Sequence, residues 1–537
     1  MSWPAGTTHL AVAAMVLKPL TLLQAGSHSS FLSLLITTSA LLAAYLVSSA
    51  LYALTLHPLA RFPGPRLCAL SRLPFWYACI TGHQVQWMHA LHMRYGPVVR
   101  YSPNDLSFVD EGNSPPGSAW RSIHGQEKGE AEFPKAKEWF VAPENGIYGI
   151  NSAASHANHR RYRRLFRPAF SSSALRAQEP LFQKHVSALL AVLSSAAATT
   201  VPGTAGSVPI DILELLNFTT FDIMGDLTLS QPLGLLASRA YTPWVTAVFA
   251  SLRVIPLAQV IQYYPLLSAL FRLVEPKVVK EMKYRHFRHS ADRVDARLGR
   301  RDEGPLNDIW EMVLKAGGAE EGDDPLSLEE MYTHADVFML AGSETTGTAM
   351  AGLVYLLLKN PDKMEKVKQE VRGAFPNGVQ EVTMERAAAR LGYLDACIQE
   401  ALRMYPPVPV GVPREVPRPG KEILSRWVAP GTRVSVHHYA TYRSPASFDE
   451  PDRFLPERHL AGAGGGDRRE ALQPFGFGPR GCIGQNMAMN EMRLIMACLL
   501  LRFDLELCDP DVDWLDQRAF VLWEKRPLMC RVREAVV

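Results

Sequence analysis

The sequence predicts a mainly α-helical domain with a minor β-sheet region, preceded by a membrane-spanning helix. At 537 residues, of which 47% are hydrophobic and 20% charged, the chain is long enough to bury a large core. Its apolar residues recur mostly at helical spacing, and only short runs alternate as strands do. Residues 31–56 form one uncharged stretch near the N-terminus. Together these observations predict an anchored, helix-rich protein.

The uncharged stretch, FLSLLITTSALLAAYLVSSALYALTL, is longer than the roughly 20 apolar residues that a helix needs to cross a bilayer. A cleaved signal peptide is the alternative, but the segment is too long for one, lies far from Met1 and has no basic region before it. We therefore expect residues 31–56 to be a transmembrane anchor. Residues 9–23 are interrupted by Lys18 and Pro19, and whether they form a second span stays open.

Basic residues around the anchor predict its orientation. Only Lys18 precedes the span, whereas Arg61, Arg66 and Arg72 follow it closely. Because cytoplasmic flanks carry the excess of Lys and Arg, residues 1–30 are expected in the lumen and the rest of the chain in the cytosol.

A proline-rich linker separates the anchor from the body of the protein. Pro58, Pro63 and Pro65 stand within HPLARFPGPR, residues 57–66, and favour an extended spacer over a helix. No internal repeat and no second linker of this quality follows. We therefore expect residues 67–537 to form one domain.

The long central segment at 325–360 predicts a helix that crosses the domain. Ser327 and Glu330 have the spacing of a capping box, and no proline interrupts the helix before its end. Gly342 and Gly347 weaken its middle by about 1 kcal/mol each relative to alanine. Such weakness fits either a ligand site, with room for oxygen and substrate, or close packing of another helix, and both readings stay open at this point.

Shorter segments complete the predicted organisation. Residues 391–405 form a helix that two prolines end, and residues 97–102 and 432–440 are the better strand candidates. Residues 316–324 and 461–466 have the composition of surface loops.

Charge and cysteine usage exclude some classes of function. The net charge of +3 is small for this length, so no general affinity for nucleic acid is expected. The seven cysteines contain no C-x-x-C pair, which fits reduced thiols facing the cytosol better than a disulfide framework.

The segment FGFGPRGCIG, residues 475–484, carries the strongest signal. Gly476, Gly478 and Gly481 formally match the G-x-G-x-x-G of dinucleotide-binding proteins. That fingerprint needs a strand before it and a helix within a βαβ unit, whereas Pro474 precedes this segment and no βαβ pattern surrounds it. A phosphate-binding loop, and with it an NAD-dependent dehydrogenase, is therefore disfavoured.

The residues around Cys482 favour a metal ligand at this position, although its residue type alone does not. Most free cysteines are small buried hydrophobes. Here glycines on both sides let backbone N–H groups approach the sulfur, which favours a thiolate. One cysteine cannot complete a zinc or iron–sulfur site, so the metal must bring its own ligands, as haem does. Arg480 is then placed to pair with an acidic group on the cofactor.

These residues resemble the cysteine-loop signature of the cytochrome P-450 superfamily, F-x-x-G-x-R-x-C-x-G. Every defined position matches, at Phe475, Gly478, Arg480, Cys482 and Gly484. Further similarities follow the chain order of that family: AGSETT at 341–346, the E-x-x-R pair Glu400 and Arg403, and the later Arg458.

The resemblance implies the cytochrome P-450 fold and a haem b cofactor whose iron is bound by the Cys482 thiolate, which favours cleavage of the O–O bond. It implies Glu344 and Thr345 as the catalytic residues that deliver protons. The haem contacts that it implies are Phe475, Gly478, Arg480, His159 and Arg163. His159 stands where many members of the family have Trp.

The E-x-x-R pair shows how little a short motif says alone. The chain repeats this spacing at Glu415/Arg418 and Glu450/Arg453, where a proline lies inside each pair. As an exposed helical pair, Glu400 and Arg403 would contribute at most about 0.5 kcal/mol. The resemblance implies instead a buried network with Arg458 that holds the cysteine loop.

The predicted function is that of a membrane-anchored haem-thiolate monooxygenase that uses O2 to hydroxylate or epoxidise a hydrophobic small molecule. The resemblance implies electrons from an NADPH-cytochrome P-450 reductase, with cytochrome b5 as a second donor, and a single-pass location in the endoplasmic reticulum membrane. The exposed side of the basic run at 159–175 would dock the donor, through Arg160, Arg161, Arg164 and Arg167. A haem-thiolate binding or sensor protein without turnover is the alternative.

Within the superfamily, HPLARFPGPR and NHRRYRRLFRPAFS are most similar to microsomal fungal members of the isotrichodermin C-15 hydroxylase group. This similarity suggests a fungal secondary metabolite, a terpenoid or polyketide, as the substrate.

Overall fold

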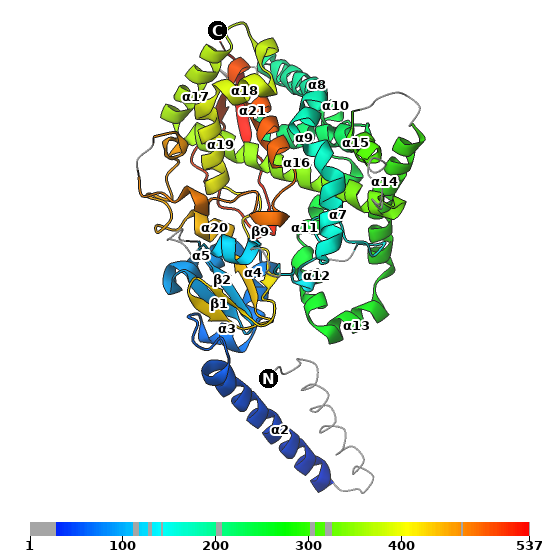
Figure 1. The fold of residues 1–537 in the computed structure, drawn as a ribbon, viewed down its shortest axis with the longest axis vertical. Helices are drawn as coiled ribbons and strands as arrows, with labels where there is room; N and C mark the ends of the chain where they lie inside the picture. The colour runs from blue at the N-terminus through cyan, green and yellow to red at the C-terminus, as the bar shows by residue number, and fades with distance from the viewer. Residues whose placement is uncertain are drawn as a thin grey trace.

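The structure is a computed structural model that describes residues 28–110, 118–126, 132–140, 143–199, 207–300, 307–316, 325–462 and 465–535. Helices dominate it and its sheets are small, as predicted (Figure 1). One long helix projects from the base of the body, beside the main sheet. The candidate second span at 9–23, most of the predicted loop at 316–324 and residues 463–464 of the predicted loop at 461–466 lie outside the described residues.

The projecting helix is α2 (His28–Leu51), which continues as a π-helical turn, η2 (Tyr52–Leu56). Residues Phe31–Leu56 are long and apolar enough to cross a membrane, and none of the most apolar window is buried in the protein. Helix α8 (Ser172–Ala198) meets the same length and hydropathy criteria, but 39% of its most apolar window is buried. The N-terminal helix is therefore the described segment that best fits an anchor.

The first half of the body is built mainly of helices. In chain order they are α3 (Arg66–Leu70), α4 (Leu73–Ile80), α5 (Gln84–Tyr95), α6 (Ala119–His124), η3 (Lys137–Trp139), α7 (His156–Phe166), η4 (Arg167–Phe170), α8, α9 (Ile212–Leu229), α10 (Leu235–Ser238), α11 (Pro243–Leu252), α12 (Ile255–Tyr263), α13 (Pro265–Val274), α14 (Lys277–Gly299) and α15 (Ile309–Ala316).

The second half contains the central helix and the remaining elements. Its helices are α16 (Leu328–Lys359), α17 (Pro361–Ala374), η5 (Val379–Glu381), α18 (Met384–Arg390), α19 (Gly392–Met404), α20 (His438–Tyr442), η6 (Pro456–His459), η7 (Arg469–Ala471), η8 (Gly478–Arg480) and α21 (Gln485–Arg502).

The largest sheet has four strands in the order β1-β2-β7-β4, formed by Val98–Ser102, Asp105–Phe108, Arg433–Val436 and Arg414–Glu415. Strands β2 and β7 run parallel, and the other pairs are antiparallel. A three-stranded sheet joins β3 (Ile210–Asp211), β11 (Met529–Glu534) and β8 (Phe503–Leu507). Two hairpins pair β5 (Lys421–Ile423) with β6 (Arg426–Val428) and β9 (Ala519–Phe520) with β10 (Leu522–Trp523).

The strand predicted at 432–440 is shorter than expected. It ends at Val436, because the His437 ring accepts a hydrogen bond from the Ala440 N–H and caps helix α20. An alternating pattern over nine residues thus covers a strand and the first turns of a helix.

The central helix α16 is capped as predicted, with Ser327 and Glu330 forming a reciprocal capping box. It packs along α9, in which every residue except Glu214 is buried. A side chain at Gly342 would collide with Met224 of α9, and one at Gly347 would collide with Asn217. The two glycines therefore allow α16 to pack closely against α9, as the second of the two readings predicts.

The proline-rich segment packs against the main sheet. Leu59 and Phe62 are buried in a cluster with residues of β1, β2 and β7. Gly64 lies so close to the Arg100 backbone carbonyl that a β-carbon would collide with it. Residues 57–66 therefore hold the end of the anchor against the sheet instead of standing free as a spacer.

Candidate active site

The cysteine loop, residues 475–484, follows the 3-10 turn η7, contains the 3-10 turn η8 and leads into α21. Gly476 and Gly478 both have a φ of +73°, a conformation that other residues rarely adopt. A β-carbon on Gly478 would also collide with the His124 carbonyl. The Cys482 N–H donates to the Phe475 carbonyl oxygen at 2.7 Å and closes the loop. These glycines are therefore required by the fold of the loop.

The loop presents the Cys482 side chain as an exposed thiol, while five of the other six cysteines are buried. Although the side chain is exposed, desolvation by the surrounding protein raises the pKa of this thiol, while a hydrogen bond from the Gly484 N–H and the charge of Arg163 favour the thiolate. Among the described residues, no three His, Cys, Asp or Glu side chains converge as a metal site would require. A metal at Cys482 must therefore bring its own remaining ligands.

Three buried cations surround one carboxylate near this loop. Arg480 donates from Nε to Glu132 Oε1 at 2.5 Å, and Arg414 Nη1 lies 3.6 Å from the same oxygen. Lys135 is also buried, and its ammonium group donates to the Asn151 carbonyl. Among the described residues of this region, three largely buried cationic side chains thus stand against the one carboxylate of Glu132, which also contacts the partly exposed His156 ring.

Burial and the excess of positive charge lower the pKa values of two of these basic groups. Burial and the charge of Arg480 lower the pKa of Arg414 to about 10, and burial with the neighbouring arginines lowers that of Lys135 well below its ordinary value. Arg414 Nε and His124 Nε2 are buried without a hydrogen-bond partner among the described residues. A ligand with two carboxylates, such as haem, would supply the missing acceptors and charge, so the residues fit that cofactor.

The predicted residues His159 and Arg163 lie beside this cluster on α7. His159 is 3% exposed, and burial together with the charges of Arg480 and Lys135 lowers its pKa to about 3, so the ring is neutral at physiological pH. The Arg163 guanidinium donates from Nη1 to the Gly481 carbonyl of the cysteine loop. The structure thus brings together the cysteine loop and α7, which are more than 300 residues apart in the chain.

Lys135, Arg414 and His124 were missed by sequence reasoning. Each stands in a segment without a recognisable motif, and nothing in the sequence distinguishes them from surface cations. Their roles depend on long-range packing of α6, β4 and the turn before η3 around the cysteine loop.

The two predicted catalytic residues are oriented differently on α16. The Thr345 side chain is partly exposed, and its hydroxyl donates to the Ala341 carbonyl at 2.6 Å. The Glu344 carboxyl group is buried and forms an ion pair with Lys525, which also donates to Thr348 Oγ1 at 2.7 Å. Burial raises the pKa of Glu344 despite Lys525. Lys525 was not predicted, because it comes from the C-terminal segment between β10 and β11.

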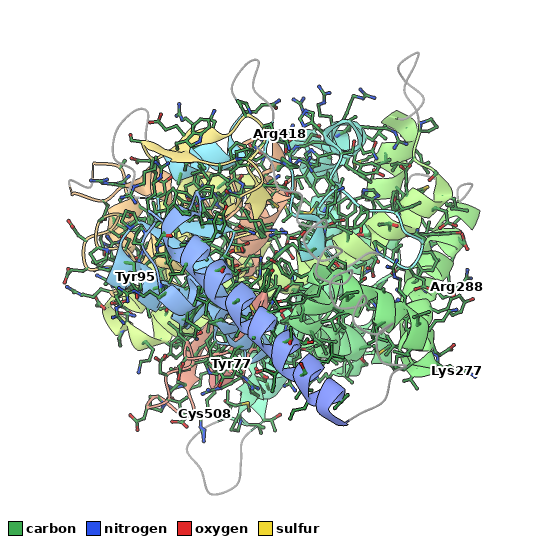
Figure 2. All side chains as sticks on the ribbon, turned by 90° about the horizontal axis from the view of Figure 1, so that it is seen from below. Tyr77, Tyr95, Lys277, Arg288, Arg418 and Cys508 are labelled. Carbon is green, nitrogen blue, oxygen red and sulfur yellow. The ribbon has the colours of Figure 1, made fainter. Side chains whose placement is uncertain are left out.

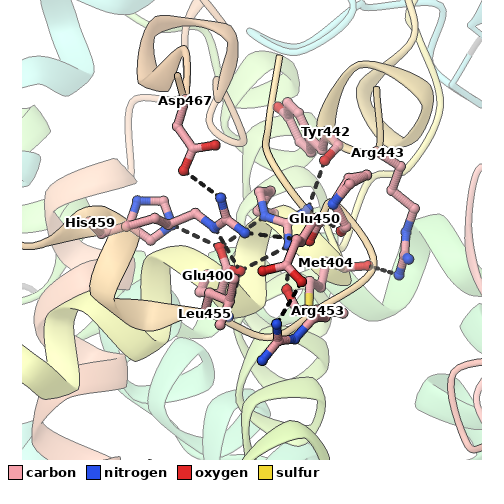
Figure 3. A network of polar contacts seen from close by, with 12 residues as sticks. Glu400, Met404, Tyr442, Arg443, Glu450, Arg453, Leu455, His459 and Asp467 are labelled. Carbon is pink, nitrogen blue, oxygen red and sulfur yellow. Dashed lines mark hydrogen bonds and ion pairs between the residues drawn. The ribbon is translucent and has the colours of Figure 1, made fainter. Parts of the chain in front are cut away.

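Glu400 is the centre of a second buried cluster (Figure 3). Arg403 donates to both of its carboxylate oxygens, at 2.8 and 2.9 Å, Arg458 donates to Oε1 at 3.1 Å, and His459 lies 2.9 Å from Oε2. The Leu455 N–H donates to Oε1 at 2.9 Å. Although burial alone would raise it, these contacts lower the pKa of Glu400 to about 2. The buried network is present, and the alternative of an exposed pair is excluded.

Arg160, Arg164 and Arg167 are exposed on α7 and η4, as the predicted docking surface requires. Arg161 differs, because its guanidinium is held by both carboxylate oxygens of Glu330 at 2.8 and 3.0 Å. This residue joins α7 to the start of α16 instead of facing outward.

Comparison with known proteins identifies a matching family and several similar proteins. Residues 63–531 match the family model described as "Cytochrome P450". The cytochrome P450 monooxygenase FUM2 of Gibberella moniliformis is 40% identical over 488 residues, which cover 90% of this chain and 100% of the relative. The monooxygenase stcF of Emericella nidulans is 37% identical, with 91% of this chain and 97% of the relative covered. An averantin hydroxylase of Aspergillus parasiticus is 38% identical, with coverage of 90% and 93%.

Proposed function

Because the chain belongs to the cytochrome P-450 family and is a monooxygenase with a haem-thiolate cofactor, we propose that it oxidises a hydrophobic fungal metabolite. In this proposal Cys482 binds the iron of haem b. The observation that carries this proposal is the exposed Cys482 thiol near a buried basic cluster in which Arg414 Nε and His124 Nε2 lack a hydrogen-bond partner among the described residues. When bound, the haem supplies the activation of O2.

The residues of the chain would hold this cofactor by charge and shape. Arg480, Lys135 and Arg414 would neutralise its two propionates, with His159 and Arg163 beside them. Phe475 and Gly478 would contact the ring from the loop, since Gly478 admits no side chain. The Arg163 bond to the Gly481 carbonyl would keep the sulfur in position.

Glu344 and Thr345 would move protons to the reacting oxygen. The partly exposed Thr345 hydroxyl would deliver the proton, and Glu344 would resupply it from the interior. The ion pair with Lys525 turns the Glu344 carboxylate toward Thr348 in this conformation. Resupply would therefore require this ion pair to open.

The relatives support hydroxylation as the reaction and secondary metabolism as its setting, because one of them is named averantin hydroxylase. We extend to this chain only the class of a hydrophobic terpenoid or polyketide. The redox partner would be an NADPH-cytochrome P-450 reductase, with cytochrome b5 as a second donor. The exposed Arg160 and Arg167 would attract its acidic surface.

The protein would be a single-pass protein of the endoplasmic reticulum, with residues 1–30 in the lumen, 31–56 in the membrane and 67–537 in the cytosol. The side of the body from which α2 projects carries exposed apolar residues, and these support this arrangement (Figures 1 and 2). Tyr77 of α4 is 74% exposed there. Helix α13 has no buried residue and exposes Leu266 and Leu273 to more than 80%. Such apolar surface is favourable against lipid.

The decisive experiment compares the carbon monoxide difference spectra of the reduced wild type and of Cys482→Ala. Wild type should give the band of a thiolate-bound haem and Cys482→Ala should not; its absence from wild type would refute the proposal. Turnover with reductase, NADPH and candidate substrates then separates an enzyme from a binding protein. In that assay Thr345→Ala should consume NADPH with little product.

A further inference from the structure

A cavity of about 290 Å³ lies where the anchor meets the catalytic body. It combines an apolar wall with two arginines, and no Asp or Glu occurs among the described residues that line it. The lining residues are Leu54, Ala60, Phe62, Gly64, Pro65, Arg66, Ala69 and Arg100.

The last turn of the anchor borders this cavity and has an unusual backbone arrangement. In the π-helical turn η2, the His57 N–H donates to the Tyr52 carbonyl at 2.8 Å. In the same pattern the Ala53 carbonyl would accept a hydrogen bond from the N–H of residue 58, but that residue is Pro58, which has no N–H. Arg100 Nη1 donates to the Ala53 carbonyl instead, at 2.8 Å. Arg100 of β1 thus fixes the last turn of the anchor to the sheet.

The cavity is electrically positive. Arg100 is 3% exposed, and its described side-chain bonds go only to the carbonyls of Ala53 and Pro103, so no carboxylate among the described residues balances it. Burial accordingly lowers the pKa of Arg100. The carboxylate of Asp105 in the same hairpin is held by Arg72 at 2.8 and 2.9 Å. Arg66 is exposed at the cavity and has no ion pair with a described residue.

The position of the cavity corresponds to the level of lipid headgroups. Leu54 belongs to the last turn of the apolar span, whereas Arg66 follows it by twelve residues of packed chain. Trp427 is 50% exposed beside the same linker, where its carbonyl accepts a hydrogen bond from Arg61. Exposed tryptophan and arginine side chains next to a span are typical of the membrane interface.

We propose that this cavity binds the phosphate of an anionic phospholipid headgroup between Arg66 and Arg100. Leu54, Ala60 and Phe62 form the apolar wall along which the glycerol and the first acyl carbons lie. A free phosphate would use the two arginines but would leave that wall without a partner. The inference rests on the membrane anchoring proposed above, and it assigns the junction between anchor and body a lipid preference that neither segment has alone.

The test titrates the full-length protein in a neutral detergent with dioctanoyl phosphatidic acid, dioctanoyl phosphatidylcholine and inorganic phosphate. Binding is read from the thermal unfolding midpoint and from lipid retained in native mass spectrometry. Phosphatidic acid should raise the midpoint and be retained, and the other two ligands should bind at least tenfold more weakly. Equal binding of phosphatidylcholine, or of inorganic phosphate, overturns the proposal.

Single arginine variants test whether phosphatidic acid binds at this cavity. Arg66→Gln should weaken phosphatidic acid binding roughly tenfold, as expected for the loss of one charge-assisted hydrogen bond. Arg176→Gln, at an exposed arginine of α8, is the matched control and should bind as wild type does. Arg100→Lys keeps the charge while removing the fork that reaches Ala53, so it should retain part of the affinity. Unchanged affinity in Arg66→Gln contradicts the proposal.

This outcome is separable from that of the proposed function. Neither readout needs haem reduction, carbon monoxide or turnover. Resistance to carbonate extraction from membranes tests the anchor by itself, in wild type and in Arg66→Gln alike. A chain that is anchored and forms the thiolate band but lacks lipid selectivity refutes only the headgroup site.

Discussion

Two buried clusters of charged residues, about 80 residues apart in the chain, are built on opposite principles. Around Glu400, Arg403 and Arg458 almost every donor has an acceptor, and backbone carbonyls take the remaining N–H groups. Around Arg480, the described residues place three cations near the single carboxylate of Glu132, with which Arg480 and Arg414 pair, and Arg414 Nε and His124 Nε2 have no described partner. The balanced cluster stabilises the fold, whereas the unbalanced cluster fits a ligand that completes it.

The largest effect is expected from breaking the balanced cluster. Glu400→Gln removes the charge that compensates Arg403 and that shares Arg458 with Asp467, and loss of one partner from a buried ion pair costs about 3–5 kcal/mol. Chemical denaturation of the full chain should show this loss in the free energy of unfolding. A loss below about 1 kcal/mol would contradict a structural role for the network.

The wild-type protein should show the same cluster in its acid stability. The native contacts lower the pKa of Glu400 to about 2, below its ordinary value of 4.5. Its contribution is therefore present above about pH 4.5 and is lost as the pH falls toward 2. Glu400→Gln should flatten this part of the stability curve.

Lys525→Met should have the next largest effect, because it leaves the Glu344 carboxylate buried without a cation. We expect a loss of about 2 kcal/mol near neutral pH. The folded-state pKa of Glu344 is already raised by burial, so the folded chain binds its proton more tightly than the unfolded chain. Stability therefore falls as the pH rises through the raised pKa, and more steeply in Lys525→Met.

The double variant Lys525→Met/Glu344→Gln is the control for this prediction. It removes the titrating group and should abolish the additional pH dependence. Persistence of that dependence would show that another group is responsible.

The unbalanced cluster predicts a change of opposite sign. Lys135→Gln removes one of three buried like charges, so the haem-free chain should become more stable by about 1 kcal/mol. The same variant should lose haem faster, measured as transfer to excess apomyoglobin. Lys137→Gln, at an exposed lysine two residues away, should change neither property. Lower stability of haem-free Lys135→Gln would contradict the reading of the cluster as unbalanced.

The sequence predicts best what depends on local pattern. The capping box of α16, the apolar N-terminal helix and the loop around Cys482 are set by residues close together in the chain, and the structure contains all three. Lys135, Arg414 and Lys525 could not be predicted, since the charged neighbours that define their roles include residues far away in the chain: Arg480 for Lys135, Glu132 for Arg414 and Glu344 for Lys525. For the glycines of α16 the sequence leaves two readings open, because weakness in a helix looks the same whether a ligand or another helix requires it, and only the contacts with α9 reveal the close packing.

The smallest effect is expected at a pair with the same spacing as Glu400 and Arg403. Glu450 and Arg453 also form an i,i+3 ion pair, with Nη1 and Oε1 at 2.6 Å, but their side chains are 56% and 64% exposed. Water already solvates both charges, so Glu450→Gln should leave the unfolding midpoint and the haem content unchanged within error. The two Glu→Gln variants thus compare one motif in two environments. Equal effects of both would show that spacing, and not burial, decides what the E-x-x-R pair contributes.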